Sequence, residues 1–124
     1  MRWLQTSTTA VLVCLVALGT IAWAGELSER QKIEALLESL KNIPDAVFVR
    51  NGTDYTADQA ADHLRRKLAA AGQRVKTAED FIACCASGSS ISGEPYRIKF
   101  SDGHIVNGAD YFRSKLNDLN GPRR

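Results

Sequence analysis

The chain has 124 residues, of which 16 are Lys or Arg and 14 are Asp or Glu, so that its formal net charge is +2. This length accommodates one small domain. A charge so close to balance disfavours a nucleic-acid-binding protein, because such proteins carry a pronounced basic face.

The first 24 residues have the pattern of a secretory signal peptide. Arg2 supplies a positive charge, residues 10–24 form an apolar run, and its last three residues, Ala-Trp-Ala, fit the small-x-small cleavage rule. We expect residues 1–24 to be removed, leaving residues 25–124 as a single periplasmic domain with no membrane span. An uncleaved membrane anchor is the alternative, because the run counted from Thr8 approaches the roughly 20 residues that a membrane-spanning helix needs.

The first part of the domain predicts a helix over residues 27–43. Ser28 and Gln31 form a capping-box pattern, in which each side chain binds a backbone amide of the first turn. Apolar residues then recur at helical spacing on one face. Pro44 ends the helix, because a proline pushes the preceding residue out of the helical conformation.

A hairpin and a second helix follow. Residues 46–50 are short, β-branched and aromatic, which predicts a strand, and Asn-Gly at residues 51–52 is a strong hairpin signal. Thr56 and Gln59 form a second capping box. The apolar stripe of this helix continues to Gly72, which we expect to end it as a left-handed cap.

The last part of the domain repeats this order. Residues 77–86 predict a third, shorter helix, and residues 96–100 alternate between apolar and charged, as in a half-buried strand. Asp-Gly at residues 102–103 is another hairpin signal. Asn107 then precedes a final helix, as a capping residue does, and Asn-Gly-Pro at residues 120–122 ends that helix.

The two hairpin–helix segments have similar sequence patterns. "FVRNGTDYTADQAADHLRRKL" and "IKFSDGHIVNGADYFRSKL" both run strand, turn, return, cap and a helix ending in R-x-K-L. Either a weak internal repeat or chance similarity between two ordinary units explains this. A repeat predicts one antiparallel sheet with helices on one face, which is a small α+β domain of about four helices and two hairpins.

The chain resembles the YfeK-like family of small secreted bacterial proteins. The resemblance covers residues 27–119 and is carried by the blocks R-N-G, H-L-R-x-K-L, T-A-E-D-F-I and S-S-x-S-G-x-P-Y. It implies a periplasmic address and a single domain of unknown function. It implies no activity, cofactor or catalytic residue.

The serine- and glycine-rich residues 87–96, which we call the Ser/Gly loop, are the candidate rim of a binding site. One interpretation is internal, with hydroxyls bonded to nearby backbone groups and Ile91 acting as a plug. The other is that hydroxyls face outward to bind a polar ligand. On that interpretation the candidate ligand-binding residues are Ser89, Ser90, Ser92, Tyr96, Arg97 and His104.

Catalytic and metal signatures are weak. The segment from Gly88 to Gly93 departs from the G-x-S-x-G spacing of a nucleophile elbow and runs from helix to strand instead of strand to helix. Neither C-x-x-C nor H-x-x-x-H occurs, and adjacent helical cysteines point about 100° apart. We therefore expect no metal and no cofactor. We also expect one packed and one half-exposed thiol at Cys84 and Cys85, with no disulfide between them.

A basic cluster lies on and after the second helix. No acidic residue occurs between positions 63 and 78, which leaves two interpretations: a solvated helix face, or a surface for an anionic partner. The cluster consists of Arg65, Arg66, Lys67, Arg74 and Lys76.

These patterns favour a non-enzymatic binding or envelope-interaction module, whose partner is an envelope component or protein and not nucleic acid. The alternative is a small hydrolase-type enzyme that uses polar groups around the Ser/Gly loop: Ser89, Ser90, Tyr96 and His104. A structural protein without a site is a third class.

Cleavage after Ala24 would remove both tryptophans of the chain, Trp3 and Trp23. We expect the purified periplasmic protein to show tyrosine-like fluorescence without a tryptophan band, and an intact mass that begins at Gly25. Tryptophan emission, or a mass that includes residues 1–24, would support the membrane anchor instead.

Overall fold

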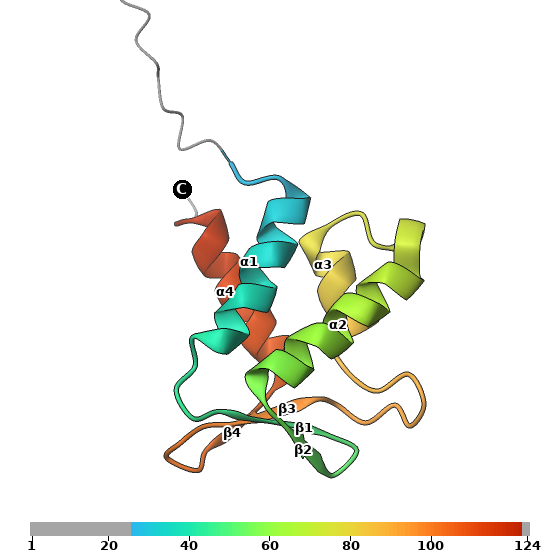
Figure 1. Ribbon diagram of the computed structural model, residues 1–124. Helices are drawn as coiled ribbons and strands as arrows, with labels where there is room; N and C mark the ends of the chain where they lie inside the picture. Colours follow the sequence, from blue (N-terminus) through green and yellow to red (C-terminus); the bar gives the residue numbers. More distant parts are fainter. Residues whose placement is uncertain (1–25, 123–124) are drawn as a thin grey trace, which may run out of the picture.

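The computed structural model describes residues 26–122 (Figure 1). Four α-helices lie on one face of a four-stranded antiparallel sheet, and the chain alternates between the two layers. The predicted α+β architecture is therefore confirmed. The predicted signal peptide, residues 1–24, lies outside the described residues.

The first two long helices begin at the predicted caps. Helix α1 spans Glu29–Lys41 and α2 spans Ala57–Ala71. Ser28 and Thr56 each accept a hydrogen bond from the backbone N–H three residues later, and Gln31 and Gln59 return the second bond of the capping box. These local bonds satisfy amides that the start of a helix leaves unpaired. The sequence alone therefore located the N-terminal caps of both helices.

The predicted third helix is present but changes its winding. Helix α3 (Ala78–Phe81) begins at a capping box between Thr77 and Asp80, and the chain continues as a π-helical segment, η2 (Ile82–Ala86). Segment η2 packs against α2 and α4. Short π-helical turns of this kind often occur near functional sites.

The two predicted hairpins form one sheet. Strands β1 (Val47–Arg50) and β2 (Thr53–Tyr55) make the first hairpin, and β3 (Arg97–Lys99) and β4 (Ile105–Asn107) make the second. The strand order is β2-β1-β3-β4, so that antiparallel pairing of β1 with β3 joins the hairpins. In this central pair Phe48 lies opposite Ile98.

Two predicted helix caps differ from expectation. Gly72 has φ 53° and ψ −122°, which is not the left-handed helical conformation, and it opens the 3₁₀ turn η1 (Gly72–Arg74). Asn107 precedes α4 (Gly108–Asn120), but its side chain makes no capping bond. The N–H of Gly108 instead donates to the Tyr96 carbonyl at 2.7 Å, because the helix begins directly against β3.

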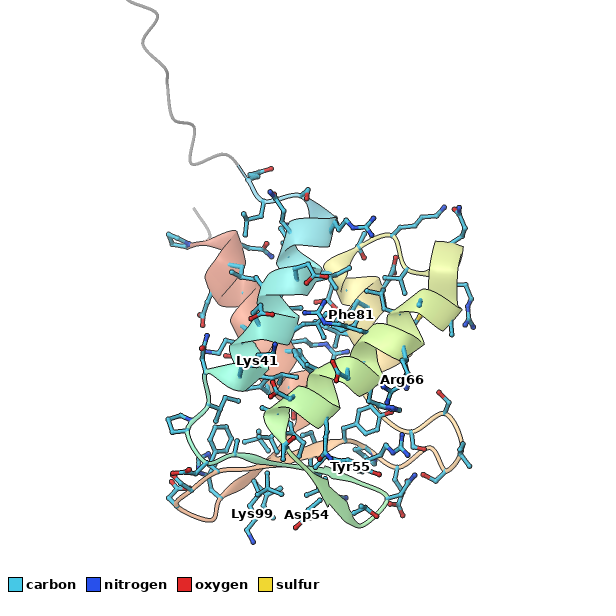
Figure 2. All side chains as sticks on the ribbon, in the orientation of Figure 1. Lys41, Asp54, Tyr55, Arg66, Phe81 and Lys99 are labelled. Atoms are coloured by element: carbon cyan, nitrogen blue, oxygen red, sulfur yellow. The ribbon has the colours of Figure 1, made fainter. Side chains whose placement is uncertain are left out.

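The hydrophobic core lies between the helices and the inner face of the sheet. Phe81 is fully buried among the helices (Figure 2) and meets Phe112 of α4 edge to face, with ring centroids 6.1 Å apart. Phe48 and Ile98 complete the core from the sheet. Lys99 and Asp54 project from the opposite face of the sheet. None of the helices within residues 26–122 is long and apolar enough to cross a membrane.

Candidate functional site

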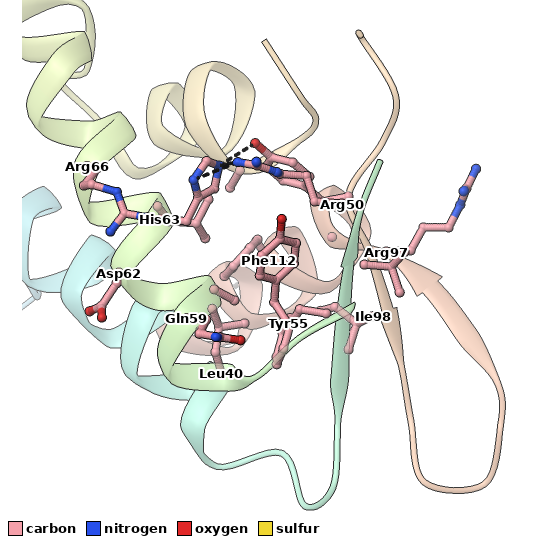
Figure 3. A pocket seen from close by; sticks show the side chains of 17 residues that line it. Leu40, Arg50, Tyr55, Gln59, Asp62, His63, Arg66, Arg97, Ile98 and Phe112 are labelled. Carbon is pink, nitrogen blue, oxygen red and sulfur yellow. Dashed lines mark hydrogen bonds between the residues drawn. The ribbon is translucent and has the colours of Figure 1, made fainter. Parts of the chain in front are cut away.

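A cavity of about 290 Å³ lies between α2 and the inner face of the sheet (Figure 3). Its size is close to the lower end of the roughly 300–1,000 Å³ range of small-molecule sites. The floor of the cavity is made by five buried apolar side chains: Leu40, Phe48, Leu64, Ile98 and Phe112. The rim of the cavity is polar and consists of Arg50, Tyr55, Gln59, Asp62, His63 and Arg66.

Four side chains form a hydrogen-bonded network at one end of this cavity. Nη1 of Arg50 lies 3.0 Å from Nδ1 and 3.1 Å from Nε2 of His63. Nε2 of His63 also lies 3.0 Å from the Tyr96 hydroxyl, and Nζ of Lys67 donates to that hydroxyl at 3.0 Å. A second bond from Nζ of Lys67 reaches the Gly88 carbonyl at 2.9 Å. We call these residues the Arg50–Lys67 network.

The pairing of β1 with β3 brings two members of the network together. Val49 lies opposite Arg97 in that ladder. One residue further along, Arg50 and Tyr96 therefore lie beside each other at the same end of the two strands. Side chains alternate between the faces of a strand, so both point to the helical side, as Phe48 does. His63 and Lys67 are four residues apart and lie on the same face of α2.

The surroundings of His63 disfavour its charged form. Burial lowers its pKa below the ordinary value of 6.5, and the positive charges of Arg50, Lys67 and Arg66 lower it further. A neutral imidazole has one acceptor nitrogen, whereas an imidazolium has none. The neutral ring is therefore the form that accepts a hydrogen bond from the Arg50 guanidinium.

The network has more donors than acceptors. Nε of Arg50 is buried without a hydrogen-bond partner in the described part of the chain. None of the ion pairs among residues 26–122 involves Arg50, Arg66 or Lys67. A buried unpaired donor costs about 1–3 kcal/mol. The arrangement is therefore suited to receive a group that carries acceptors and negative charge.

The basic cluster predicted on one helix face occupies several environments. Arg65 forms ion pairs with Glu34 and Glu38 of α1, at 2.8 and 3.3 Å. Lys67 turns inward to the network, and Arg66 is exposed at the rim of the cavity. Only part of the cluster is therefore a solvated face.

The Ser/Gly loop is tied to the first hairpin. The Ser89 hydroxyl accepts bonds from Nδ2 of Asn51 and from the backbone N–H groups of Ile91 and Ser92, at 3.2–3.3 Å. The Ser92 hydroxyl donates to Oδ1 of Asn51 and accepts from the N–H of Glu94. Asn51 thus uses both ends of its amide to hold the loop beside the β1–β2 turn.

One part of the internal interpretation of this loop is wrong. Ile91 was expected to plug the loop, but its side chain is 93% exposed. The hydroxyl–backbone bonds of the loop close it without an apolar anchor, and so leave Ile91 at its tip. Ser90 is likewise exposed, whereas Ser89 is buried.

The candidate ligand-binding residues do not gather at one place. Tyr96 and Arg97 both line the cavity, but only Tyr96 belongs to the Arg50–Lys67 network, whereas the Arg97 side chain extends away from the cavity in Figure 3. His104 lies in the β3–β4 turn, where its Nδ1 contacts Oδ1 of Asp102 and its ring stacks on Phe100. Ser89, Ser90 and Ser92 remain in the loop. Whether any of them binds a ligand stays a prediction.

Sequence reasoning missed Arg50, His63 and Lys67 as one group. Two signals were present. Arg50 shares strand parity with Phe48, which places a charged side chain on the core-facing side of β1. His63 and Lys67 are separated by one helical turn and border the apolar stripe.

Cys84 and Cys85, the cysteines within residues 26–122, are free, as expected from their adjacent helical positions. Cys84 is exposed and Cys85 is buried, and burial raises the pKa of the Cys85 thiol. Within residues 26–122, no three His, Cys, Asp or Glu side chains gather as ligands for a metal ion.

Ser89→Ala should destabilise the fold because it removes a buried hydroxyl that accepts three hydrogen bonds in a mostly exposed loop. We expect the free energy of unfolding to fall by about 1–2 kcal/mol and the melting temperature to fall by several degrees. Ser90→Ala is the matched control at an exposed position and should change stability by less than about 0.5 kcal/mol. Equal melting temperatures for the two variants would contradict the structural role of Ser89.

Folding stability should depend on pH through His63. Its folded pKa lies below its unfolded value, so the unfolded chain binds a proton more readily. The stability contributed by the neutral ring is fully present above about pH 6.5 and is lost as the pH falls through the folded pKa. We expect the free energy of unfolding, measured by urea denaturation between pH 5 and 7.5, to depend less steeply on pH in His63→Gln than in wild type. An unchanged pH dependence of the free energy of unfolding in His63→Gln would contradict the argument.

Comparison with known proteins places the chain in a family. Residues 27–120 match the model of a family of unknown function, DUF5329. An uncharacterised protein of Salmonella typhimurium, YfeK, is 43% identical over 88 residues, which are 70% of this chain and 72% of that protein. No solved structure matches. The chain belongs to the family of unknown function DUF5329.

Proposed function

We propose that this protein is a non-enzymatic, periplasmic binding module that holds a small ligand in the cavity between α2 and the sheet. The observation that carries the proposal is the combination of a floor of buried apolar side chains with polar groups at one end. This combination is typical of small-molecule sites, in which apolar surface supplies affinity and a few polar groups fix orientation.

The surroundings of the serines support binding over hydrolysis. A serine nucleophile needs a base within hydrogen-bonding reach. The Ser89 hydroxyl is surrounded by N–H donors from Asn51, Ile91 and Ser92. His104 lies in the second hairpin, where it contacts Asp102.

The periplasmic address rests on the N-terminal sequence. The charged start, the apolar run and the small residues before Gly25 form the pattern of a secretory signal. A protein exported in this way meets envelope components before any cytoplasmic metabolite, so we place the ligand among molecules of the envelope.

The proposal is tested by NMR mapping with short amphiphiles. We expect 1-octanol and octanoate to shift the backbone amide signals of Phe48, Leu64 and Phe112 in the purified protein. Ala60 lines the cavity from α2, so Ala60→Leu should fill part of the space and weaken both probes about tenfold or more.

The matched control is Ala69→Leu, an exposed position on the same helix, which should leave binding unchanged. Circular dichroism of both variants checks that the fold is retained. The proposed function would be contradicted if neither probe shifted the amide signals of the cavity residues. It would also be contradicted if Ala60→Leu and Ala69→Leu weakened probe binding equally.

A further inference from the structure

The cavity combines two chemical environments that point to a class of ligand. Its floor presents Phe48, Leu64 and Phe112, which offer only apolar contact. Its other end presents Arg50, whose guanidinium meets a histidine in place of a carboxylate. Arg66 adds a second guanidinium at the rim.

We propose that the ligand is a small amphiphilic anion, with one carboxylate or phosphate group at Arg50 and Arg66 and a short apolar chain on the cavity floor. This inference rests on the proposed function and specifies the chemistry of its ligand. Guanidinium groups pair well with both head groups, because their parallel N–H donors match two oxygens of a carboxylate or phosphate.

The hydrogen-bond inventory favours an anion over a cation or a neutral ligand. Arginine and lysine side chains have donors and no acceptors. Lys67 has found two acceptors, the Gly88 carbonyl and the Tyr96 hydroxyl. Arg50 retains a buried Nε without a partner among the described residues. A cation would add donors and like charge to this end, whereas an anion supplies both acceptors and opposite charge.

The cavity volume restricts the apolar part. About 290 Å³ is too little for a lipid with two long chains and suits one short chain. The buried floor excludes water from that chain, so each additional methylene adds affinity until the cavity is full.

Asp62 is the acidic group on the rim, and it opposes the proposed charge preference. Its side chain is exposed on α2, about one helical turn before Arg65 and Arg66. Exposed charges act weakly because solvent screens them. Asp62→Asn should therefore strengthen anion binding by a small factor, about twofold, and leave a neutral probe unaffected.

The test compares probes that share a chain and differ in the head group. Octanoate and octyl phosphate should each bind the purified protein at least about tenfold more tightly than 1-octanol at low salt, as measured by amide shifts in NMR titrations. Their relative affinity assigns the head group as carboxylate or phosphate. Acetate and inorganic phosphate, which lack the chain, should bind far more weakly than either octyl anion.

Two arginine substitutions separate the head-group site from overall charge. Arg66→Gln at the exposed rim should weaken both octyl anions about two- to fivefold without affecting 1-octanol. Arg74→Gln removes the same charge from an exposed position outside the cavity lining and should change nothing. Arg50→Gln should abolish the preference for anions over 1-octanol. Its folded state is checked by circular dichroism, and Arg66→Gln keeps the test decisive if that variant unfolds.

Binding of an anion beside His63 should also raise the pKa of that histidine, which the Cε1 proton signal reports directly. His104 serves as the internal control. Equal affinity for 1-octanol and the octyl anions would overturn the anion inference while leaving the cavity function intact. Equal affinity for inorganic phosphate and octyl phosphate would overturn the amphiphile inference. If none of the probes shifted the amide signals of the cavity residues, the proposed function itself would be contradicted.

Discussion

The antiparallel pairing of β1 with β3 is the contact on which the rest of the structure depends. It joins two local hairpins into one sheet, and it gives the helices a single surface to cover. The register of this pair places Phe48 opposite Ile98 in the core. The same register brings Arg50 beside Tyr96 at the end of the ladder. A shift of one residue would turn these side chains to the outer face of the sheet.

At the cavity end of the molecule, Arg50 and Lys67 form no ion pair within residues 26–122, and Asp62, the acidic group of the rim, is exposed. Arg65, by contrast, forms an ion pair with Glu34 across two helices. Arg50 instead contacts His63, whose charged form is disfavoured, and stacks over the Tyr55 ring at 5.5 Å. Such an environment is less favourable for the folded chain alone than an ion pair would be. Functional sites commonly keep polar groups incompletely satisfied for a ligand.

Features decided by neighbouring residues were predictable from the sequence, whereas the site was not. The capping boxes at Ser28 and Thr56 and the turn at Asn51-Gly52 depend on contacts within a few residues, and all three were located correctly. The cavity depends on the register between β1 and β3, which lie almost fifty residues apart in the chain. Periodicity placed the Ser/Gly loop between a helix and a strand. It gave no indication that Asn51 would hold that loop or that Ile91 would lie outside it.

A structure of the protein in complex with octanoate tests the central claim most directly. The account predicts the carboxylate within about 3 Å of the Arg50 guanidinium, with the alkyl chain lying against Phe48 and Phe112. Octanoate on the outer face of the sheet near Lys99, or in the cavity with its carboxylate turned away from Arg50 and Arg66, would contradict the account.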